Sequence, residues 1–355
     1  MTVVRKAQFL GKSAIRKGLY YHASLFGAHS RRFRRERAYI LSYHSIGAEN
    51  DPCFRSIGAS ISVARKAFER QMAYLAERYR VVSLDALLAF LSTGRAEYDD
   101  DRPLLALTFD DGYRDNYERA YPVLRRHGLT ATFFLTVDCI GGDHALWQMR
   151  LRDTILNGGT GTLVIDGLAP LGLKTLKEKY QALKIIGRHL IAVPREVREE
   201  TIRCLQEQTG VGNEKMLAAA MLNWEQVREM QRGGMTFGSH TLSHPSLPYI
   251  PEEEAWQEIS RSKAIIEQQL DAPVLHFCYP NPTGKKNFNQ RLRSMLRKAG
   301  YESAVTSQNG YVVPGDDTLE MRRKGINRGH GTLPDFYFQI EEEAIRDTWK
   351  QRRLG

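Results

Sequence analysis

Cysteine is scarce in this sequence, and long apolar runs are missing. The four cysteines are scattered and form no Cys-x-x-Cys pair, which argues against a disulfide framework or a thiolate metal site. Reduced thiols are typical of a cytoplasmic protein. No run approaches the roughly 18 apolar residues of a membrane span, and basic residues interrupt the short apolar stretches of residues 1–18, unlike a cleaved signal peptide. We therefore expect a cytoplasmic protein without a membrane span.

Positive charge is concentrated at the N-terminus. Residues 1–37 contain ten lysines or arginines and one acid, Glu36, so they carry +9 of the chain's formal +10. Apolar residues recur at helical spacing between Phe9 and Tyr20, with basic residues beside them. Such a basic amphipathic arm favours peripheral contact with an anionic membrane at the inner face; the alternative is a helix packed on the domain with a solvated basic face. Nucleic acid is not expected as a partner, because nothing else in the chain extends the basic patch.

Strand-like and helix-like segments alternate from residue 38 onward. The chain has 355 residues, 42% of them hydrophobic, enough for one large α/β domain with an insertion or for two domains. The strand-like segments are 38–46, 80–82, 105–109, 129–137, 235–239, 274–280, 301–307 and 321–328. This alternation predicts a parallel sheet or barrel.

The alternation stops between residues 143 and 220. Helical stretches surround a short hairpin there, which we interpret as a mainly helical insertion that covers the strand ends and supplies substrate contacts. The chain then divides into an arm at 1–37, an α/β unit at 38–340 that contains the insertion, and a C-terminal tail at 341–355.

Two adjacent acids, Asp110 and Asp111, follow the apolar strand 105–109 and precede Gly112. Neighbouring side chains of a strand point to opposite faces, so a continued strand would drive one of these charges into the core. We therefore expect the strand to end here, with Gly112 turning the chain. The carboxyl ends of parallel strands are where α/β enzymes hold their catalytic groups.

Two histidines follow another strand. His240 and His244 come after the segment 235–239 at a spacing of four, which on one helical turn would place both imidazoles on one face. One carboxylate and two histidines form a common open hydrolytic metal site. The second carboxylate could then act as a base toward the water.

At this point the chain resembles the polysaccharide deacetylases of the carbohydrate esterase family 4 type. The resemblance is carried by TFDDG at 108–112, SHTLSH at 239–244 and FCYPNPTG at 277–284, and it spans residues 38 to 330. It implies a distorted (β/α) barrel of about seven strands.

The resemblance also implies a site and a reaction. Asp110 would be the general base, and Asp111 would bind one divalent metal, usually zinc, together with His240 and His244. The reaction would be hydrolysis of an acetamide on an N-acetylated polysaccharide or lipid-linked saccharide. The alternatives are a hydrolase of another non-peptide C–N bond and a carbohydrate-binding homologue with weak catalysis.

The third motif departs from the best-known members of this family. Cys278 occupies the position of an arginine that orients the base, so we expect that ion pair to be missing. The Phe-x-Tyr-Pro pattern resembles an FxYP subgroup, in which Tyr279 and Asn281 would contact substrate. The backbone N–H of Asn281 could help to hold an oxyanion.

The general acid has no clear counterpart in this sequence. His330 follows the last strand-like segment and is our candidate, with a surface-loop histidine as the alternative. His44 ends the first strand, so it should face the same end of the barrel and line the substrate site.

Overall fold

The computed structural model describes residues 14, 17–18, 36–47, 51, 53–95, 102–159, 161–281 and 287–354, the side chains of 344–354 excepted. The basic arm predicted at 1–37 therefore lies almost entirely outside the described residues. None of the described helices is both long and apolar enough to cross a bilayer.

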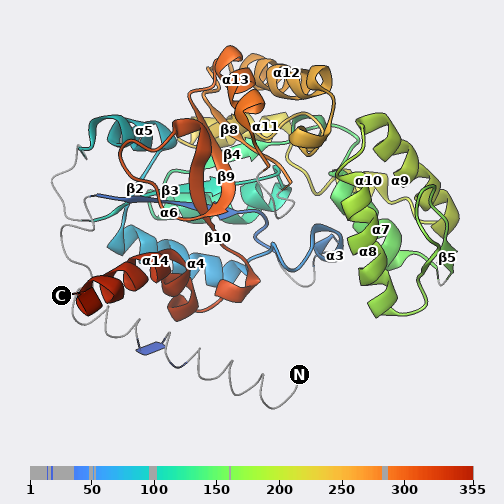
Figure 1. Cartoon of the computed structure of the whole chain (residues 1–355), viewed down its shortest axis with the longest axis horizontal. Helices are drawn as coiled ribbons and strands as arrows, with labels where there is room; N and C mark the ends of the chain where they lie inside the picture. Colours follow the sequence, from blue (N-terminus) through green and yellow to red (C-terminus); the bar gives the residue numbers. More distant parts are fainter. Residues whose placement is uncertain are drawn as a thin grey trace.

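Seven parallel strands form a closed barrel (Figure 1). In the order around the barrel they are β1 (Ala38–Tyr43), β3 (Leu104–Phe109), β4 (Thr132–Leu135), β7 (Thr236–Ser239), β8 (His276–Cys278), β9 (Ser303–Asn309) and β10 (Met321–Gly325). The pairing of β10 with β1 and of β1 with β3 closes the ring, and β2 (Arg80–Val82) adds to β3. The predicted distorted (β/α) barrel of about seven strands is confirmed.

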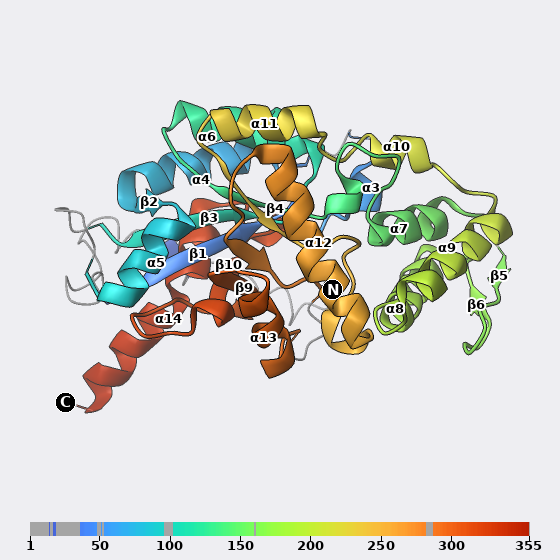
Figure 2. The ribbon, with the colours of Figure 1, turned by 90° about the horizontal axis from the view of Figure 1, so that it is seen from above.

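Helices surround the barrel, as Figures 1 and 2 show from two sides. They are α3 (Phe54–Ile57), α4 (Arg65–Arg78), α5 (Leu84–Thr93), α6 (Tyr121–Arg126), α11 (Trp224–Arg232), α12 (Glu252–Leu270), α13 (Gln290–Lys298) and α14 (Leu333–Leu354). A π-helical turn (Asn116–Ala120) precedes α6. Helix α5 closes the amino end of the barrel, because its apolar side chains join the cluster that fills the barrel interior.

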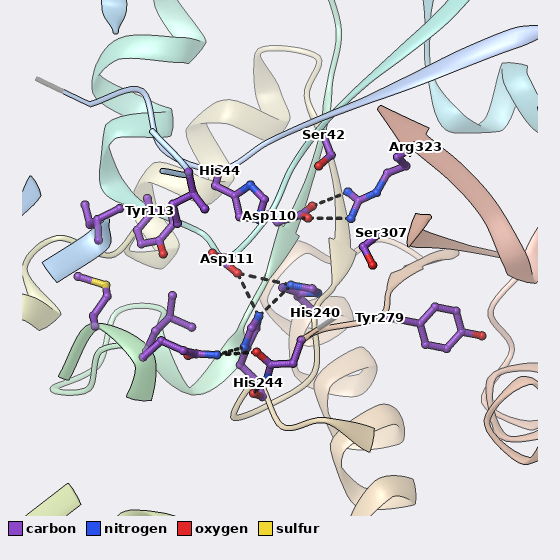
Figure 3. A pocket seen from close by; sticks show the side chains of 16 residues that line it. Ser42, His44, Asp110, Asp111, Tyr113, His240, His244, Tyr279, Ser307 and Arg323 are labelled. Carbon is purple, nitrogen blue, oxygen red and sulfur yellow. Dashed lines mark hydrogen bonds and ion pairs between the residues drawn. The ribbon is translucent and has the colours of Figure 1, made fainter. Parts of the chain in front are cut away.

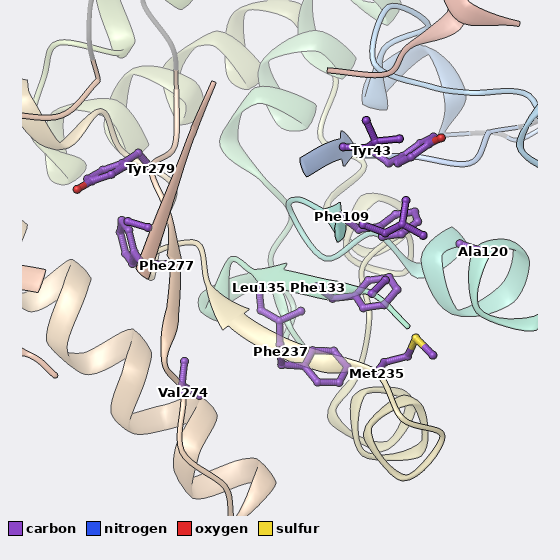
Figure 4. Packing of buried hydrophobic residues seen from close by; sticks show 14 of the residues in the cluster. Tyr43, Phe109, Ala120, Phe133, Leu135, Met235, Phe237, Val274, Phe277 and Tyr279 are labelled. Carbon is purple, nitrogen blue, oxygen red and sulfur yellow. The ribbon is translucent and has the colours of Figure 1, made fainter. Parts of the chain in front are cut away.

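A row of aromatic rings shows how the strands alternate their side chains. Tyr43, Phe109, Phe133 and Phe237 are in register on β1, β3, β4 and β7. Their ring centroids are 5.3, 4.7 and 5.8 Å apart in succession (Figure 4), and such pairs stabilise by about 0.5–1.5 kcal/mol beyond their buried area. These rings pack in the cluster shared with the outer helices, so the alternate residues of each strand face the barrel interior.

Residues 143–220 form a helical lobe beside the carboxyl end of the barrel (Figures 1 and 2). The lobe contains α7 (Trp147–Asn157), α8 (Leu176–Leu190), α9 (Arg195–Thr209) and α10 (Glu214–Ala218), with a small hairpin of β5 (Thr162–Leu163) and β6 (Leu171–Gly172). Helices α7, α8 and α9 bury their own apolar cluster. Helix α7 therefore belongs to the lobe's core at the same time as it borders the barrel.

Helix α14 continues through residue 340, the expected end of the α/β unit. Glu341 accepts hydrogen bonds from the hydroxyls of Tyr39 and Tyr79, at 2.8 and 2.6 Å. The segment named a tail, 341–355, thus begins inside a helix that is attached to the barrel.

Candidate active site

The two adjacent acids lie at the carboxyl end of β3 and face different partners. Asp110 follows Leu104, Ala106 and Thr108, the positions of β3 that face the barrel interior, and shares the Nη1 group of Arg323 with Thr108. Asp111 and Gly112 both have left-handed backbone angles, φ +79° and +83°, so the strand ends there and the chain turns away. The positive φ of Gly112 would strain any residue with a side chain, and a Cβ there would also meet Ile140 Cδ1 at 2.8 Å, so glycine suits this turn.

The two histidines follow β7, but they do not lie on a helix. Thr241 and His244 have positive φ angles of +70° and +60°, and the segment is an irregular loop. The buried carboxylate of Glu258 on α12 accepts hydrogen bonds from the backbone N–H groups of Leu242 and Ser243 at 2.8 and 2.9 Å. The helical turn expected from the spacing is therefore wrong, and a buried carboxylate shapes the loop instead.

Asp111, His240 and His244 converge on one point (Figure 3). Asp111 Oδ1 lies 3.4 Å from His240 Nε2 and 3.2 Å from His244 Nε2, and the two Nε2 atoms are 3.1 Å apart. All three side chains are buried, and Oδ1 has no partner with hydrogen-bond geometry among the described residues. Tetrahedral zinc with ligands at about 2.0–2.1 Å needs ligand atoms about 3.3–3.4 Å apart. The donor types and their spacing therefore fit such an ion.

The ring of His240 is oriented by the main chain. Its Nδ1 lies 2.8 Å from the carbonyl oxygen of Cys278, to which an Nδ1–H donates. The lone pair of Nε2 then points toward Asp111, as a metal ligand requires. Burial lowers the pKa of His244.

A second group of potential ligands, formed by Asp110, His240 and Cys278, overlaps the first. Burial raises the pKa of the Cys278 thiol, so its sulfur stays protonated. Both oxygens of Asp110 are already occupied by Arg323. The group that contains Asp111 is the better fit.

Arg323 on β10 holds Asp110 in place. Its Nη1 and Nη2 donate to the two carboxylate oxygens at 2.7 and 2.8 Å, and Nε donates to Thr306 O at 2.9 Å. Burial alone would raise the pKa of Asp110, but the charge and hydrogen bonds of Arg323 outweigh it and hold the pKa below its ordinary value. The expectation that an orienting ion pair is missing is therefore wrong, because the arginine comes from β10 instead of β8. Arg322, Arg323 and Lys324 form a run that looks like a solvated surface, which hid this residue from sequence reasoning.

The site opens into a cavity of about 330 Å³ at the carboxyl end of the barrel. Of the residues singled out in the sequence, its lining includes His44, Asp110, Asp111, His240, His244, Tyr279 and Asn281. His44 is partly exposed, with Nε2 3.9 Å from Asp110 Oδ2.

The structure does not bring His330 to this cavity. His330 ends a 3₁₀ turn (Arg328–His330), where its Nδ1 accepts a hydrogen bond from the backbone N–H of Asn327 at 3.1 Å. Its carbonyl oxygen accepts a hydrogen bond from Gln71 on α4. The expectation that His330 is the general acid is therefore wrong. His330 does follow the last strand, but its side chain does not line the cavity.

Tyr279 and Asn281 have different roles in the architecture. The Tyr279 hydroxyl donates to Leu319 O at 3.1 Å, so the ring extends away from the histidines (Figure 3). Asn281 stays at the mouth, where its Nδ2 donates to His244 O at 2.6 Å.

Other lining residues were not singled out in the sequence. Besides Arg323, they include Tyr113, Gln148, Ser42, Ser307 and the aliphatic residues Ile57, Ile61, Leu146 and Met149. Burial, and then the Asp111 carboxylate, raise the pKa of Tyr113, so its hydroxyl remains protonated beside the site. Leu146, Gln148 and Met149 belong to the start of the helical lobe, which sequence reasoning had no signal to connect with His244.

Comparisons with known proteins agree on one family. The family model for polysaccharide deacetylase matches residues 97–157 and 187–304. A curated relative from Bacillus subtilis (strain 168), "Putative polysaccharide deacetylase YxkH", is 23% identical over 291 residues, which cover 82% of this chain and 71% of the relative.

Solved structures share the fold at low sequence identity. The Streptococcus pyogenes deacetylase PplD, in complex with acetate, aligns with a TM-score of 0.56 and 20% identity, over 86% of this chain and 97% of that one. IcaB from Ammonifex degensii aligns with a TM-score of 0.54 and 17% identity, over 86% and 98% of the two chains.

Proposed function

Because this chain belongs to the polysaccharide deacetylase family and is a deacetylase, we propose that it removes N-acetyl groups from an amino-sugar glycan by divalent-metal catalysis. The observation that carries the proposal is the convergence of Asp111, His240 and His244 within 3.4 Å of one another, next to a second carboxylate. Zinc is the proposed ion, since two imidazoles and one carboxylate suit it and leave a position open. The pattern of Phe277, Tyr279 and Pro280 supports membership of the FxYP subgroup.

The metal would be held by Asp111, His240 and His244. When bound, a divalent ion supplies Lewis acidity for the acetamide carbonyl and for the attacking water. Asp110 takes a proton from that water, and Arg323 keeps its carboxylate ionised and aimed into the cavity. Asn281 lines the cavity, and its backbone N–H is the proposed donor to the developing oxyanion.

His44 is the proposed proton donor in place of His330. It lines the cavity on the opposite side of Asp110 from Arg323 (Figure 3), with its Nε2 3.9 Å from Asp110 Oδ2. Asn116 Nδ2 fixes the backbone of His44 by donating to His44 O at 2.7 Å. When the C–N bond breaks, the amine nitrogen takes a proton from His44 and acetate leaves with the oxygen of water. Proton transfer by a positioned group contributes about 10²–10⁴-fold.

The test combines metal content with product release. We expect wild-type protein to bind one equivalent of zinc and to release acetate from N-acetylglucosamine oligomers. His240→Ala should lose both properties, because a ligand is removed. His144→Ala is the matched control, since His144 is exposed and outside the cavity, and it should keep both.

Two outcomes would contradict the proposal. Stoichiometric zinc in His240→Ala would remove the ligand assignment. Zinc binding without acetate release from any N-acetylated sugar, but with hydrolysis of cyclic amides, would change the substrate class and keep the site.

A further inference from the structure

We infer that Gln148 on helix α7 is a positioning residue for the metal ligand His244. The inference rests on the proposed function, because it concerns how this chain prepares a histidine to bind the ion. It makes the N-terminus of the helical lobe part of the metal site.

Two consecutive residues of α7 contact His244. The side-chain nitrogen of Gln148 lies 2.6 Å from His244 Nδ1, and Trp147 Nε1 donates to His244 O at 3.0 Å. Trp147 is 3% exposed, so this contact is fixed within the packed interface between lobe and barrel. Helix α7 thus holds both the backbone and the ring of His244.

An imidazole that binds a metal through one nitrogen needs a hydrogen-bond acceptor for the proton on the other. If Nε2 of His244 binds the ion, the proton of the neutral ring sits on Nδ1 and needs an acceptor. Among the described residues, the Gln148 amide is the group recorded within hydrogen-bond distance of Nδ1. Its oxygen, Oε1, is buried and has no partner in the described part of the chain.

A half-turn of the Gln148 amide gives the Nδ1 proton of His244 an acceptor and gives Oε1 of Gln148 a donor. The oxygen and nitrogen of a glutamine have nearly the same shape, so rotation about the last side-chain bond exchanges their positions. Oε1 then accepts the Nδ1 proton and fixes the ring with its Nε2 lone pair toward Asp111. The rotation gives up the hydrogen bond that Gln148 Nε2 donates to Asn281 Oδ1 at 2.9 Å and turns Oε1 toward that oxygen instead, which offsets part of the gain.

The two histidine ligands are therefore supported in different ways. His240 donates to a backbone carbonyl, which no side-chain substitution removes. His244 depends on a side chain contributed from almost a hundred residues away in the sequence. This asymmetry makes the support of His244 directly testable.

The helical lobe also holds the loop around this ligand. Arg198 on α9 donates from Nη2 to Ser243 Oγ at 3.0 Å, and its guanidinium lies 5.6 Å from the centre of the Trp147 ring. The lobe thus contacts residues 243 and 244, and the Ser243 hydroxyl that Arg198 binds also donates to Glu258. Its role goes beyond the substrate contacts expected from the sequence.

Isosteric variants at position 148 separate hydrogen bonding from packing. Gln148→Met keeps the side-chain length and removes the acceptor, and Gln148→Glu presents oxygen at both positions, as the rotated amide does. The measurement is the zinc dissociation constant of each full-length protein, by competition with a chromophoric chelator. We expect Gln148→Met to weaken zinc binding about 10–100-fold, and Gln148→Glu to bind at least as tightly as wild type.

The outcomes distinguish this inference from the proposed function. If wild type binds zinc and His240→Ala does not, but Gln148→Met and Gln148→Glu both match wild type within twofold, the positioning role is wrong and the metal site stands. If wild type binds no zinc, the proposed function itself fails. Thermal unfolding of the metal-free proteins shows whether each variant is folded. Should Gln148→Met not fold, Gln148→Asn takes its place, because the shorter amide cannot reach Nδ1 and predicts the same loss.

Discussion

Asp110 is 3% exposed, and an isolated carboxylate at such a depth would be costly. Arg323 compensates this charge through two hydrogen bonds to the carboxylate, and Thr108 and Thr306 bind the guanidinium in turn. Arg323 Nη2 also lies 3.1 Å from the sulfur of Cys278. A small residue at 278 thus leaves room for a guanidinium that arrives from a strand two places away.

In this chain the arginine that binds Asp110 comes from position 323 instead of position 278. Moving the arginine back to position 278 tests whether the two positions are equivalent. Arg323→Ala should leave Asp110 buried and unpaired, which destabilises the protein by about 3–5 kcal/mol and misaligns the base. We expect the double variant Arg323→Ala/Cys278→Arg to recover part of the lost stability and activity, because a side chain at 278 reaches the same space. The measurements are urea unfolding and kcat/KM for acetate release.

Zinc content provides the control for this exchange. Arg323 does not contact the proposed ligands, so Arg323→Ala should keep its zinc. A double variant no better than Arg323→Ala would show that β8 and β10 cannot substitute for each other at this site.

The carboxylates and histidines of the site could be predicted, but the arginine could not. Asp110 and Asp111 stand out because paired charges after an apolar strand are unusual. Arg323 and Lys324 are both buried, yet they sit within a run of three basic residues that is typical of a solvated strand. In a closed barrel both faces of a strand are covered, so exposure cannot be read from polarity alone.

At the scale of elements, the segment after β3 forms the carboxyl end of that strand and also binds the residues that follow β1. The chain after β3 carries the two acids and then Asp115, which binds the exit of β1. Ser45 Oγ donates to Asp115 Oδ2 at 2.5 Å, and the backbone N–H of Ile46 donates to Oδ1 at 3.1 Å. Burial raises the pKa of Asp115 to about 6 despite these hydrogen bonds. The segment directly after His44 is therefore held by a carboxyl group with a raised pKa.

Asp115 should make stability depend on pH in a defined direction. Its pKa is about 6 when folded and about 3.9 when unfolded, so between these values the folded state binds more protons. The contribution of this group, on the order of 2–3 kcal/mol, is fully present below pH about 4 and is lost as pH rises through about 6. Asp115→Asn removes the titration.

The measurement is the unfolding free energy of wild type and Asp115→Asn between pH 4 and 7. We expect the difference between the two proteins to change across this window, and the exposed control Asp166→Asn measures the effect of the same substitution at the surface. A constant difference for Asp115→Asn would show that the group has an ordinary pKa in the folded protein.

The strands and helices could be predicted from the sequence where the local pattern of apolar and polar residues determines them. Strand β2, for example, lies at the expected residues 80–82, and Ser83 directly after it starts α5 by accepting a hydrogen bond from the Ala86 N–H. The loop of His240 and His244 did not follow, because two left-handed residues and Glu258, which is far away in the sequence, set its shape. The spacing of four residues correctly paired His240 with His244, but the helical turn from which we argued the pairing is absent.

At the scale of the whole molecule, the lobe and the barrel share the site. The contacts of Trp147 and Gln148 with His244 join residues almost a hundred positions apart, and no periodicity in either segment encodes them. The alternation of strand and helix along the chain predicted a parallel sheet or barrel, and the resemblance to the deacetylase family implied the barrel. The position of the lobe on the barrel could not be predicted, because it depends on contacts between two separate hydrophobic cores.

The charge of the whole chain leads to a proposal about where the enzyme works. Residues 1–37 carry +9 and the rest of the chain +1, so the arm should dominate attraction to anionic surfaces, at about 1 kcal/mol per basic residue near a membrane. We propose that the protein is cytoplasmic and uses this arm to reach the inner membrane face. The proposed catalytic groups begin at His44, so the arm can be removed without touching them.

Arg37 sets the point of truncation, because its guanidinium lies 4.2 Å from the centre of the Tyr311 ring and belongs to the folded unit. We expect full-length protein to bind vesicles that contain anionic phospholipid, and to release them as salt shortens the Debye length below about 10 Å. Deletion of residues 1–35 should abolish this binding and leave acetate release from soluble oligomers unchanged. Cosedimentation at several salt concentrations measures the first effect, with neutral vesicles as the control. Binding that ignores salt, or that survives the deletion, would instead make the arm a packed helix whose basic face is merely solvated.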